Sequence, residues 1–187
     1  MKHNLASTET LIRDLATRMI SRPDELETGA QCDEHGTALI AMRCAPEDEG
    51  VLVGKGGCHV KAFAYLVERI GLARKKEYLF KLKTNGGCNE TLFDPQYATR
   101  HDTGPGKVLL ERVFRELSIN TAQIRPEETP IDIPVLNYVF HVELNDETAL
   151  ARLFAQSQSG TPLIGHIASL FRAIAARVGV RYQIELE

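Results

Sequence analysis

The sequence predicts an α+β protein built from two copies of one small unit, each in the order helix, strand, strand, helix, helix, strand. Apolar residues recur at helical spacing in some segments and alternate in others. The apolar pattern of the first half also returns 104 residues later, so that Tyr78 and Phe80 correspond to Tyr182 and Ile184. The repeat predicts two units with three-stranded sheets packed by helices.

The first unit opens with an amphipathic helix and a hairpin. We expect Ser7 to cap the helix and Pro23 to end it. Strands follow at about 27–33 and 37–44, joined by a tight turn at Glu34-His35-Gly36.

A short helix should begin at Pro46 and run to about Val53, with acidic residues in its first turn. After a glycine turn, apolar residues from Val60 to Ile70 form the stripe of a longer helix. The alternation at 77–83 predicts a strand with one buried face.

The second unit follows a segment without periodicity. We expect the first domain at 1–84, a linker at 85–104 and the second domain at 105–187. In the second domain a helix starts near Pro105 and a strand spans about 136–144. Asp146 caps a short helix, the stripe from Ile164 to Val178 marks a longer one, and the last strand places Tyr182, Ile184 and Leu186 inward.

Composition excludes several classes of protein. The 187 residues are 43% hydrophobic and 25% charged, with a formal net charge of −3, as in soluble globular proteins. No apolar run reaches the roughly 18 residues of a membrane span, and the first residues are too polar for a signal peptide. The four cysteines lack C-x-x-C spacing, so we expect no metal site, no disulfide framework and a cytoplasmic protein. Eight Lys and Arg stand against two Glu between residues 55 and 83, a local basic surface that begins at the glycine turn.

The glycine turn, in the sequence VLVGKGG, is the main functional signal. Gly50 and Gly54 are separated by three residues and Lys55 is followed by Gly56, which does not fit a Walker A loop. The turn joins two helices, whereas a dinucleotide fingerprint must follow a strand. Both readings fail, and we expect no cofactor.

Residues 42–67, MRCAPEDEGVLVGKGGCHVKAFAYLV, resemble a type II KH domain, and most closely the small bacterial KhpA-like RNA-binding proteins. The resemblance covers about residues 7–84. Glycines let a backbone approach a sugar-phosphate chain closely, and the next helix presents its free N–H groups there. KH domains clamp about four single-stranded nucleotides with this loop.

The resemblance therefore implies RNA contacts from a loop, an apolar groove and flanking basic side chains. The groove walls include strand residues near Ile40 and Met42. The expected RNA-binding residues are Gly54, Lys55, Gly56, Gly57, Val51, Val53, Val60, Lys61 and Arg43.

The second unit departs from the family at this position. Gln158-Ser159-Gly160-Thr161 stands where the glycine turn stands in the first unit, and the lysine is gone. We expect a degenerate KH-like domain that packs on the first domain or binds a protein partner, with self-association through the second domain as an alternative. Its apolar helix from Ile164 to Val178 is a candidate cover for a surface that single-domain relatives use to pair.

Three alternatives remain open. The ligand is expected to be single-stranded RNA, although loop contacts do not exclude single-stranded DNA. The protein is expected not to be an enzyme, but Cys58 near a helix start is a possible nucleophile. The main rival is a protein-interaction module that keeps the KH shape without binding nucleic acid. No membrane partner is expected.

Overall fold

The computed structural model describes residues 2–32, 36–84, 103–129, 137–158 and 160–187. Over these residues it contains six α-helices and two three-stranded sheets, which confirms the predicted α+β class. The chain divides into two compact units, Met1–Phe93 and Asp94–Glu187. None of the helices in the described ranges has the length and apolar character needed to cross a membrane.

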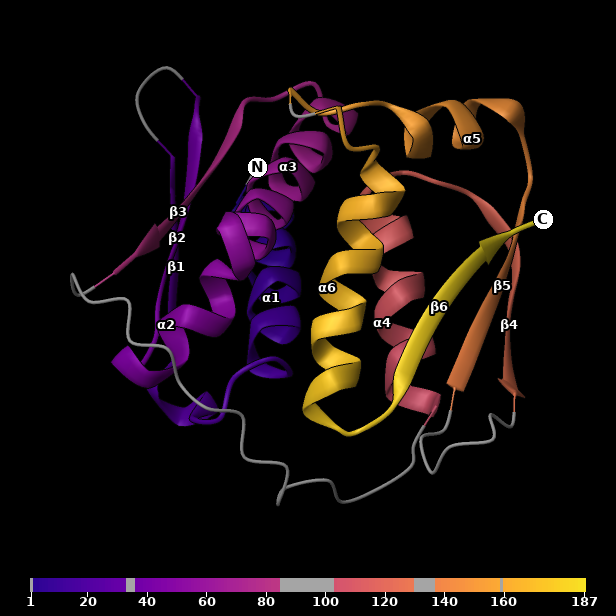
Figure 1. Ribbon diagram of the computed structural model, residues 1–187. Coiled ribbons are helices and arrows are strands. Elements are labelled where there is room, and N and C mark those ends of the chain that lie inside the picture. The colour runs from indigo at the N-terminus through magenta and orange to yellow at the C-terminus, as the bar shows by residue number, and fades with distance from the viewer. Residues whose placement is uncertain (1, 33–35, 85–102, 130–136, 159) are drawn as a thin grey trace. The chain divides into compact units, whose positions relative to one another are not determined.

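The first unit is built around a central strand (Figure 1). Its elements are α1 (Lys2–Thr17), the short 3-10 helix η1 (Pro23–Glu25), β1 (Glu27–Cys32), β2 (Ala38–Arg43), α2 (Pro46–Val53), the short 3-10 helix η2 (Lys55–Gly57), α3 (Cys58–Ala73) and β3 (Tyr78–Lys83). Strand β2 pairs antiparallel with β1 and parallel with β3. A parallel pair needs a crossover connection, and α2 and α3 supply it.

One prediction for this unit was wrong, and another falls mostly on residues that the structure does not describe. Helix α1 begins at Lys2, so Ser7 lies inside the helix and the predicted cap was wrong. A serine is tolerated within a helix, so its presence alone does not mark a helix start. The predicted turn at Glu34-His35-Gly36 lies outside the described residues except for Gly36.

The first sheet has one covered face and one open face. Ala38, Ile40 and Met42 are at most 2% exposed, so these alternate residues of β2 point into the core. The rings of Phe63 on α3 and Phe80 on β3 stack with centroids 5.5 Å apart. Figure 1 shows α1 and α3 on this side of the sheet, and the opposite face lies open.

The second unit repeats the element order of the first. Its elements are α4 (Thr103–Glu116), β4 (Thr121–Thr129), β5 (Asn137–Leu144), α5 (Glu147–Phe154), α6 (Leu163–Arg177) and β6 (Arg181–Leu186). Strand β5 is central, antiparallel to β4 and parallel to β6. The expected linker at 85–104 lies outside the described residues, apart from the start of α4 at Thr103.

An aromatic cluster fills the core of the second unit. Phe140 on β5 contacts Tyr182 on β6 and Phe171 on α6, with ring centroids 5.2 and 6.5 Å away. The sheet register pairs Tyr138 with Tyr182, as it pairs Ala38 with Tyr78 in the first unit. The last strands of both units therefore carry an inward tyrosine at or next to their first residue, as the sequence repeat predicted.

Candidate nucleic-acid interface

The glycine turn has a backbone shape that only glycine adopts easily. Gly54, Gly56 and Gly57 have φ of 72°, 62° and 76°. Gly54 combines its φ with a ψ of 165°, a region that is essentially restricted to glycine. A Cβ on Gly54 would lie 2.7 Å from the ring of His59, whereas a Cβ on Gly56 would meet no atom within 4 Å. Gly54 is therefore required for both conformation and space, and Gly56 for conformation alone.

Side-chain and backbone contacts from α3 hold the turn. The Nδ1 atom of His59 lies 2.7 Å from the carbonyl oxygen of Val51, which links α3 to the last turn of α2. The N–H of Gly57 donates to the Gly54 carbonyl at 2.9 Å. The ammonium of Lys61 donates to the Gly56 carbonyl at 3.2 Å. Lys61 therefore supports the turn as well as adding charge beside it.

The charge at the turn is positive. Lys55 and Lys61 are both exposed, and neither forms an ion pair with a carboxylate in the described part of the chain. Gly57 occupies the N-cap position of α3 without a side chain to cap the N–H groups of the first turn. Uncapped N–H groups and the positive end of the helix dipole favour an anion at this position.

A buried aspartate fixes α2, and sequence reasoning missed it. Asp48 is 3% exposed. Its Oδ1 accepts hydrogen bonds from the Ser21 N–H at 2.8 Å and the Ser21 hydroxyl at 2.7 Å, and its Oδ2 accepts from the Arg22 N–H at 2.9 Å. The sequence indicated only an acidic residue at a helix start. No local pattern signals a partner 27 positions away.

The cysteines near the site have different surroundings. Cys44 is buried, and burial, together with the negative charges of Asp48 and Glu49, raises the pKa of its thiol to about 11. Cys44 therefore stays protonated and is a poor nucleophile. Cys58 is half-buried at the start of α3. Across the described residues, no cluster of three or more His, Cys, Asp or Glu is arranged to hold a metal ion.

The structure brings most of the expected contact residues together, but not all of them. Val51 and Val53 on α2 and Val60 on α3 are half-buried on the two sides of the turn. The side chains of Ile40 and Met42 offer no surface to a ligand, because these residues are 0% and 1% exposed in the core. The alternation of β2 was the signal that could have excluded them.

Arg43 is separated from the turn. It ends β2 on the open face of the sheet, where its guanidinium pairs with Glu27 through bonds of 3.0 and 3.2 Å. Arg43 precedes α2 and Gly54 follows it, so the two residues stand at opposite ends of a helix about 12 Å long at 1.5 Å per residue. Arg43 therefore does not belong to the cluster around the turn.

This element order, with a glycine turn between two helices on one face of the sheet, defines a type II KH domain. Residues 9–82 match the family described as KhpA/KhpB, KH domain. Over 72 residues the chain is 29% identical to the RNA-binding protein KhpA of Caldanaerobacter subterraneus subsp. tengcongensis, covering 38% of this chain and 95% of that protein. Both matches fall in the first unit, which is similar to the KhpA/KhpB family of KH domains, in agreement with the resemblance that the sequence indicated. The matched segment ends at residue 82, before the second unit.

The second unit has a different connection at the equivalent place. Helices α5 and α6 are joined by residues 155–162, which are braced by a bridge between Gln156 and Pro162 and by a bond from the Ser157 N–H to the Thr161 carbonyl. Gly160 has a φ of 78°, but no lysine is present there. Ser159 lies outside the described residues.

Proposed function

We propose that the first unit binds single-stranded RNA, without catalysis, through the Gly54–Gly57 loop and the half-buried valines beside it. One observation carries the proposal: three glycines with positive φ place Lys55 next to the uncapped start of α3. The name of the bacterial relative, RNA-binding protein KhpA, supports RNA as the ligand.

In this proposal the loop binds the phosphates and the valines contact the bases. Lys55 adds a full charge to the partial charges of the α3 N–H groups, so that a phosphate is bound by both. Val51, Val53 and Val60 offer aliphatic surface to bases that are not paired or stacked. The free thiols of Cys32, Cys44 and Cys58 suit a reducing compartment, and we place the protein in the cytoplasm.

The second unit is proposed to be a degenerate KH-like copy, with domain bounds of 1–84 and 105–187. Its element order supports this, and its loop supports a loss of RNA contacts, because it has one glycine in place of three and no cation. The tandem arrangement would then contain one RNA-binding domain and one supporting domain.

Fluorescence anisotropy with a pool of short single-stranded RNAs, across a salt series, tests the loop. The Lys55→Asp, Gly56→Asp variant should lose most of the binding, because it places two carboxylates at the phosphate site. Asp tolerates the left-handed backbone of Gly56, and circular dichroism checks the fold. Lys75→Asp is the control for the charge reversal at Lys55, since Lys75 is exposed, has a φ of 56° and lies at the other end of α3. No binding by the wild type, or equal binding by the loop variant, would contradict the proposal.

A protein-interaction role is the second candidate, and an exposed apolar pair favours it. Leu150 and Phe154, one helical turn apart on α5, are 43% and 54% exposed. Sedimentation of the full chain, with Leu150→Ser and Phe154→Ser as variants, separates this role from RNA binding. Association that depends on these side chains would support it, and a monomer with or without them would remove it.

A further inference from the structure

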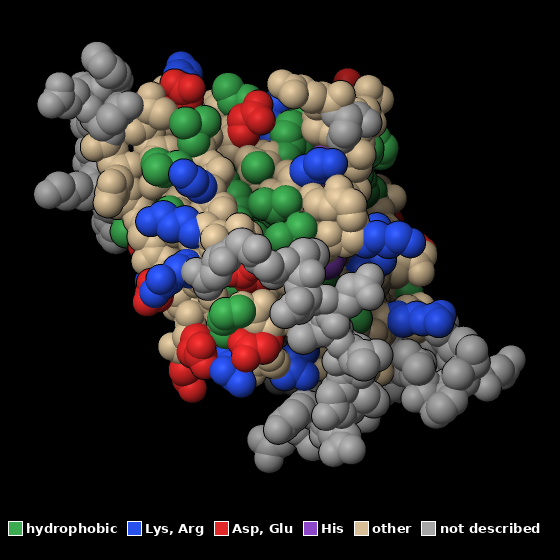
Figure 2. All heavy atoms as spheres, turned by 60° about the vertical axis from the view of Figure 1, so that its left-hand side comes forward, with side chains coloured by type: hydrophobic (Ala, Val, Ile, Leu, Met, Phe, Trp, Pro, Cys, Tyr) green, Lys and Arg blue, Asp and Glu red, His purple; other side chains and the backbone are tan. Residues whose placement is uncertain are grey.

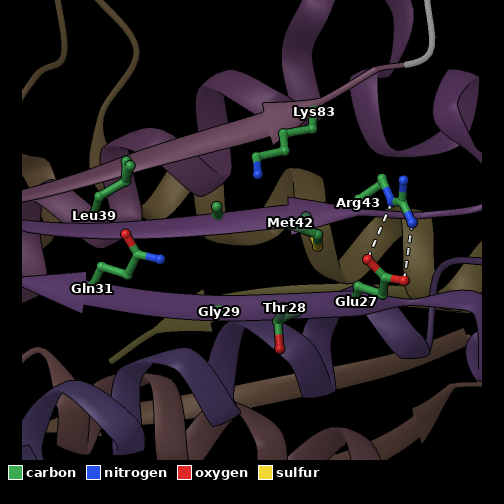
Figure 3. A pocket seen from close by; sticks show the side chains of 9 residues that line it. Glu27, Thr28, Gly29, Gln31, Leu39, Met42, Arg43 and Lys83 are labelled. Carbon is green, nitrogen blue, oxygen red and sulfur yellow. Dashed lines mark hydrogen bonds and ion pairs between the residues drawn. The ribbon is translucent and has the colours of Figure 1, made fainter.

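The open face of the first sheet carries a shallow hollow of about 430 Å³. Gly29 on β1 and Ala41 on β2 are partners in the sheet register and form its floor, so the hollow exists because both side chains are small. Figure 3 shows Gln31 and Leu39 at one end of the hollow, and Arg43 and Lys83 at the other.

Positive charge is concentrated at one end of this face. Arg43 and Lys83 are direct neighbours in the register of β2 and β3, and Lys81 follows on the same face of β3. Both lysines are exposed and form no ion pair with the residues that the structure describes. Glu27 is the carboxylate at this end, and it pairs with Arg43. Figure 2, with the left-hand side of Figure 1 turned forward, shows hydrophobic side chains in the middle of this view, with Lys and Arg and also Asp and Glu side chains around them.

The same end of the first unit holds the glycine turn. Helix α3 packs along β3, and only residues 74–77 connect them, so the two elements run antiparallel. The start of α3 therefore lies at the end of the sheet where β2 and β3 finish, at Arg43 and Lys83. In Figure 1 the arrowhead of β3 accordingly lies on the same side as α2. A nucleic-acid strand leaving the loop has these cations on its path.

We propose that this open face is a second nucleic-acid contact, in which Arg43, Lys81 and Lys83 bind phosphates of a single strand that continues past the Gly54–Gly57 loop. The inference rests on the proposed function of that loop. The amide of Gln31, which has donor and acceptor groups, meets the edge of a base that lies on the Gly29–Ala41 floor. Arg43 exchanges its pairing with Glu27 for a phosphate, which a guanidinium binds with the same bidentate geometry.

The equivalent sheet face of the second unit carries different charges from the open face of the first. On the equivalent face of its sheet, His141 lies among the carboxylates of Glu127, Glu187 and Glu185, at 3.0, 3.1 and 3.7 Å. Arg125 on this face is paired with Glu187, and the carboxylates around His141 repel phosphates. The cationic face is therefore a property of the unit that carries the glycine turn.

Oligonucleotides of two lengths distinguish the contact at the glycine turn from the contact on the open sheet face. Binding of the full chain is measured with single-stranded oligonucleotides of about five and about twelve nucleotides, the shorter being close to the span of one KH loop. The Lys81→Glu, Lys83→Glu variant should weaken binding of the longer strand roughly tenfold and flatten its salt slope by about 1.4, as expected for two lost phosphate contacts. Binding of the shorter strand should stay within about twofold, because a loop contact does not reach the sheet face.

Two further variants complete the design. Glu27→Gln frees Arg43 and should tighten binding of the longer strand only. Arg18→Glu, Lys75→Asp makes the same change in charge at exposed positions elsewhere in the first unit, and it should weaken the longer strand much less than the Lys81, Lys83 variant does. An equal loss of binding in this control variant would overturn the inference, because the effect would then follow from net charge alone.

The proposed function and the inference fail in different ways. If neither oligonucleotide binds to the wild type, the loop proposal fails and the inference falls with it. If both bind and the Lys81, Lys83 variant leaves the longer strand unaffected, only the inference fails. A change in sedimentation of that variant, without a change in RNA binding, would assign the open face to a protein partner and overturn the inference as well.

Discussion

The two helix connections, Gly54–Gly57 in the first unit and residues 155–162 in the second, show how the same element order can present different chemistry. The first is a four-residue turn with three glycines in the left-handed region, an exposed lysine and a histidine that links α3 to α2. The second is longer, is braced by its own backbone bonds, and has no cation. The short turn leaves Lys55 and Gly56 exposed, whereas the longer connection contains bonds from the Ser157 N–H to the Thr161 carbonyl and from the Gly160 N–H to the Ser157 carbonyl.

The helices that precede the two connections, α2 and α5, are also held in place by different contacts. Asp48 binds α2 to the segment after α1 with both carboxylate oxygens. Asp146 acts as the N-cap of α5 and accepts one bond, from the Ala149 N–H at 2.6 Å. The helix that precedes the glycine turn is therefore anchored by tertiary contacts, and its counterpart by a local cap.

The largest expected effect distinguishes the two glycines. Gly54→Ala should lower the free energy of unfolding by about 3 kcal/mol, because alanine is excluded from that backbone region and its Cβ meets His59. Gly160→Ala should cost about 1 kcal/mol, since the backbone is left-handed but no atom lies within 4 Å of the new Cβ. Urea unfolding measures both, with amide hydrogen exchange assigning each loss to a unit. Equal losses would mean that the two turns are under the same constraint.

The two aspartates give the next largest difference. Asp48→Asn should cost about 2 kcal/mol, because the new amide turns an N–H toward a backbone or hydroxyl donor that the carboxylate satisfied. Asp146→Asn should have almost no effect, since asparagine caps a helix as well as aspartate does. Thermal unfolding of the two variants compares them directly. A small loss in Asp48→Asn would show that the contacts of α2 with Ser21 and Arg22 contribute little.

The smallest expected effect is a difference in pH response. Burial raises the pKa of the Cys44 thiol from 9.0 to about 11. As the pH rises above about 9, the unfolded chain therefore loses this proton before the folded chain does. The first unit should lose about 1 kcal/mol of its free energy of unfolding at pH 10. Burial lowers the pKa of His166, so the unfolded chain takes up this proton first and the second unit loses stability as pH falls below 6.5.

Urea unfolding from pH 5 to 10, with hydrogen exchange in each unit, measures this pH response. Cys44→Ala should remove part of the loss of stability at alkaline pH, and His166→Gln should remove the loss of stability at acidic pH. Unchanged pH profiles in both variants would show that these two groups do not produce the difference.

The periodicities predicted much of the fold because each depends on neighbouring residues alone. Helix α2 was predicted with its observed ends, and the alternation in β3 and β6 identified the inward faces of Tyr78 and Tyr182. Strand β4 was not identified, because Pro126 and its charged neighbours hide the pattern of an edge strand, where proline is tolerated.

The sequence by itself determined the element order of the first unit, the glycine turn between two helices and the resemblance of this unit to a KH domain. These features follow from local backbone preferences and from residues adjacent in the chain. Only the tertiary structure decided that Arg43 pairs with Glu27 on the open face of the sheet, that Asp48 binds the segment after α1, and that His59 joins α3 to α2. Each of these depends on which surfaces pack together and on partners distant in sequence, which a local pattern does not encode.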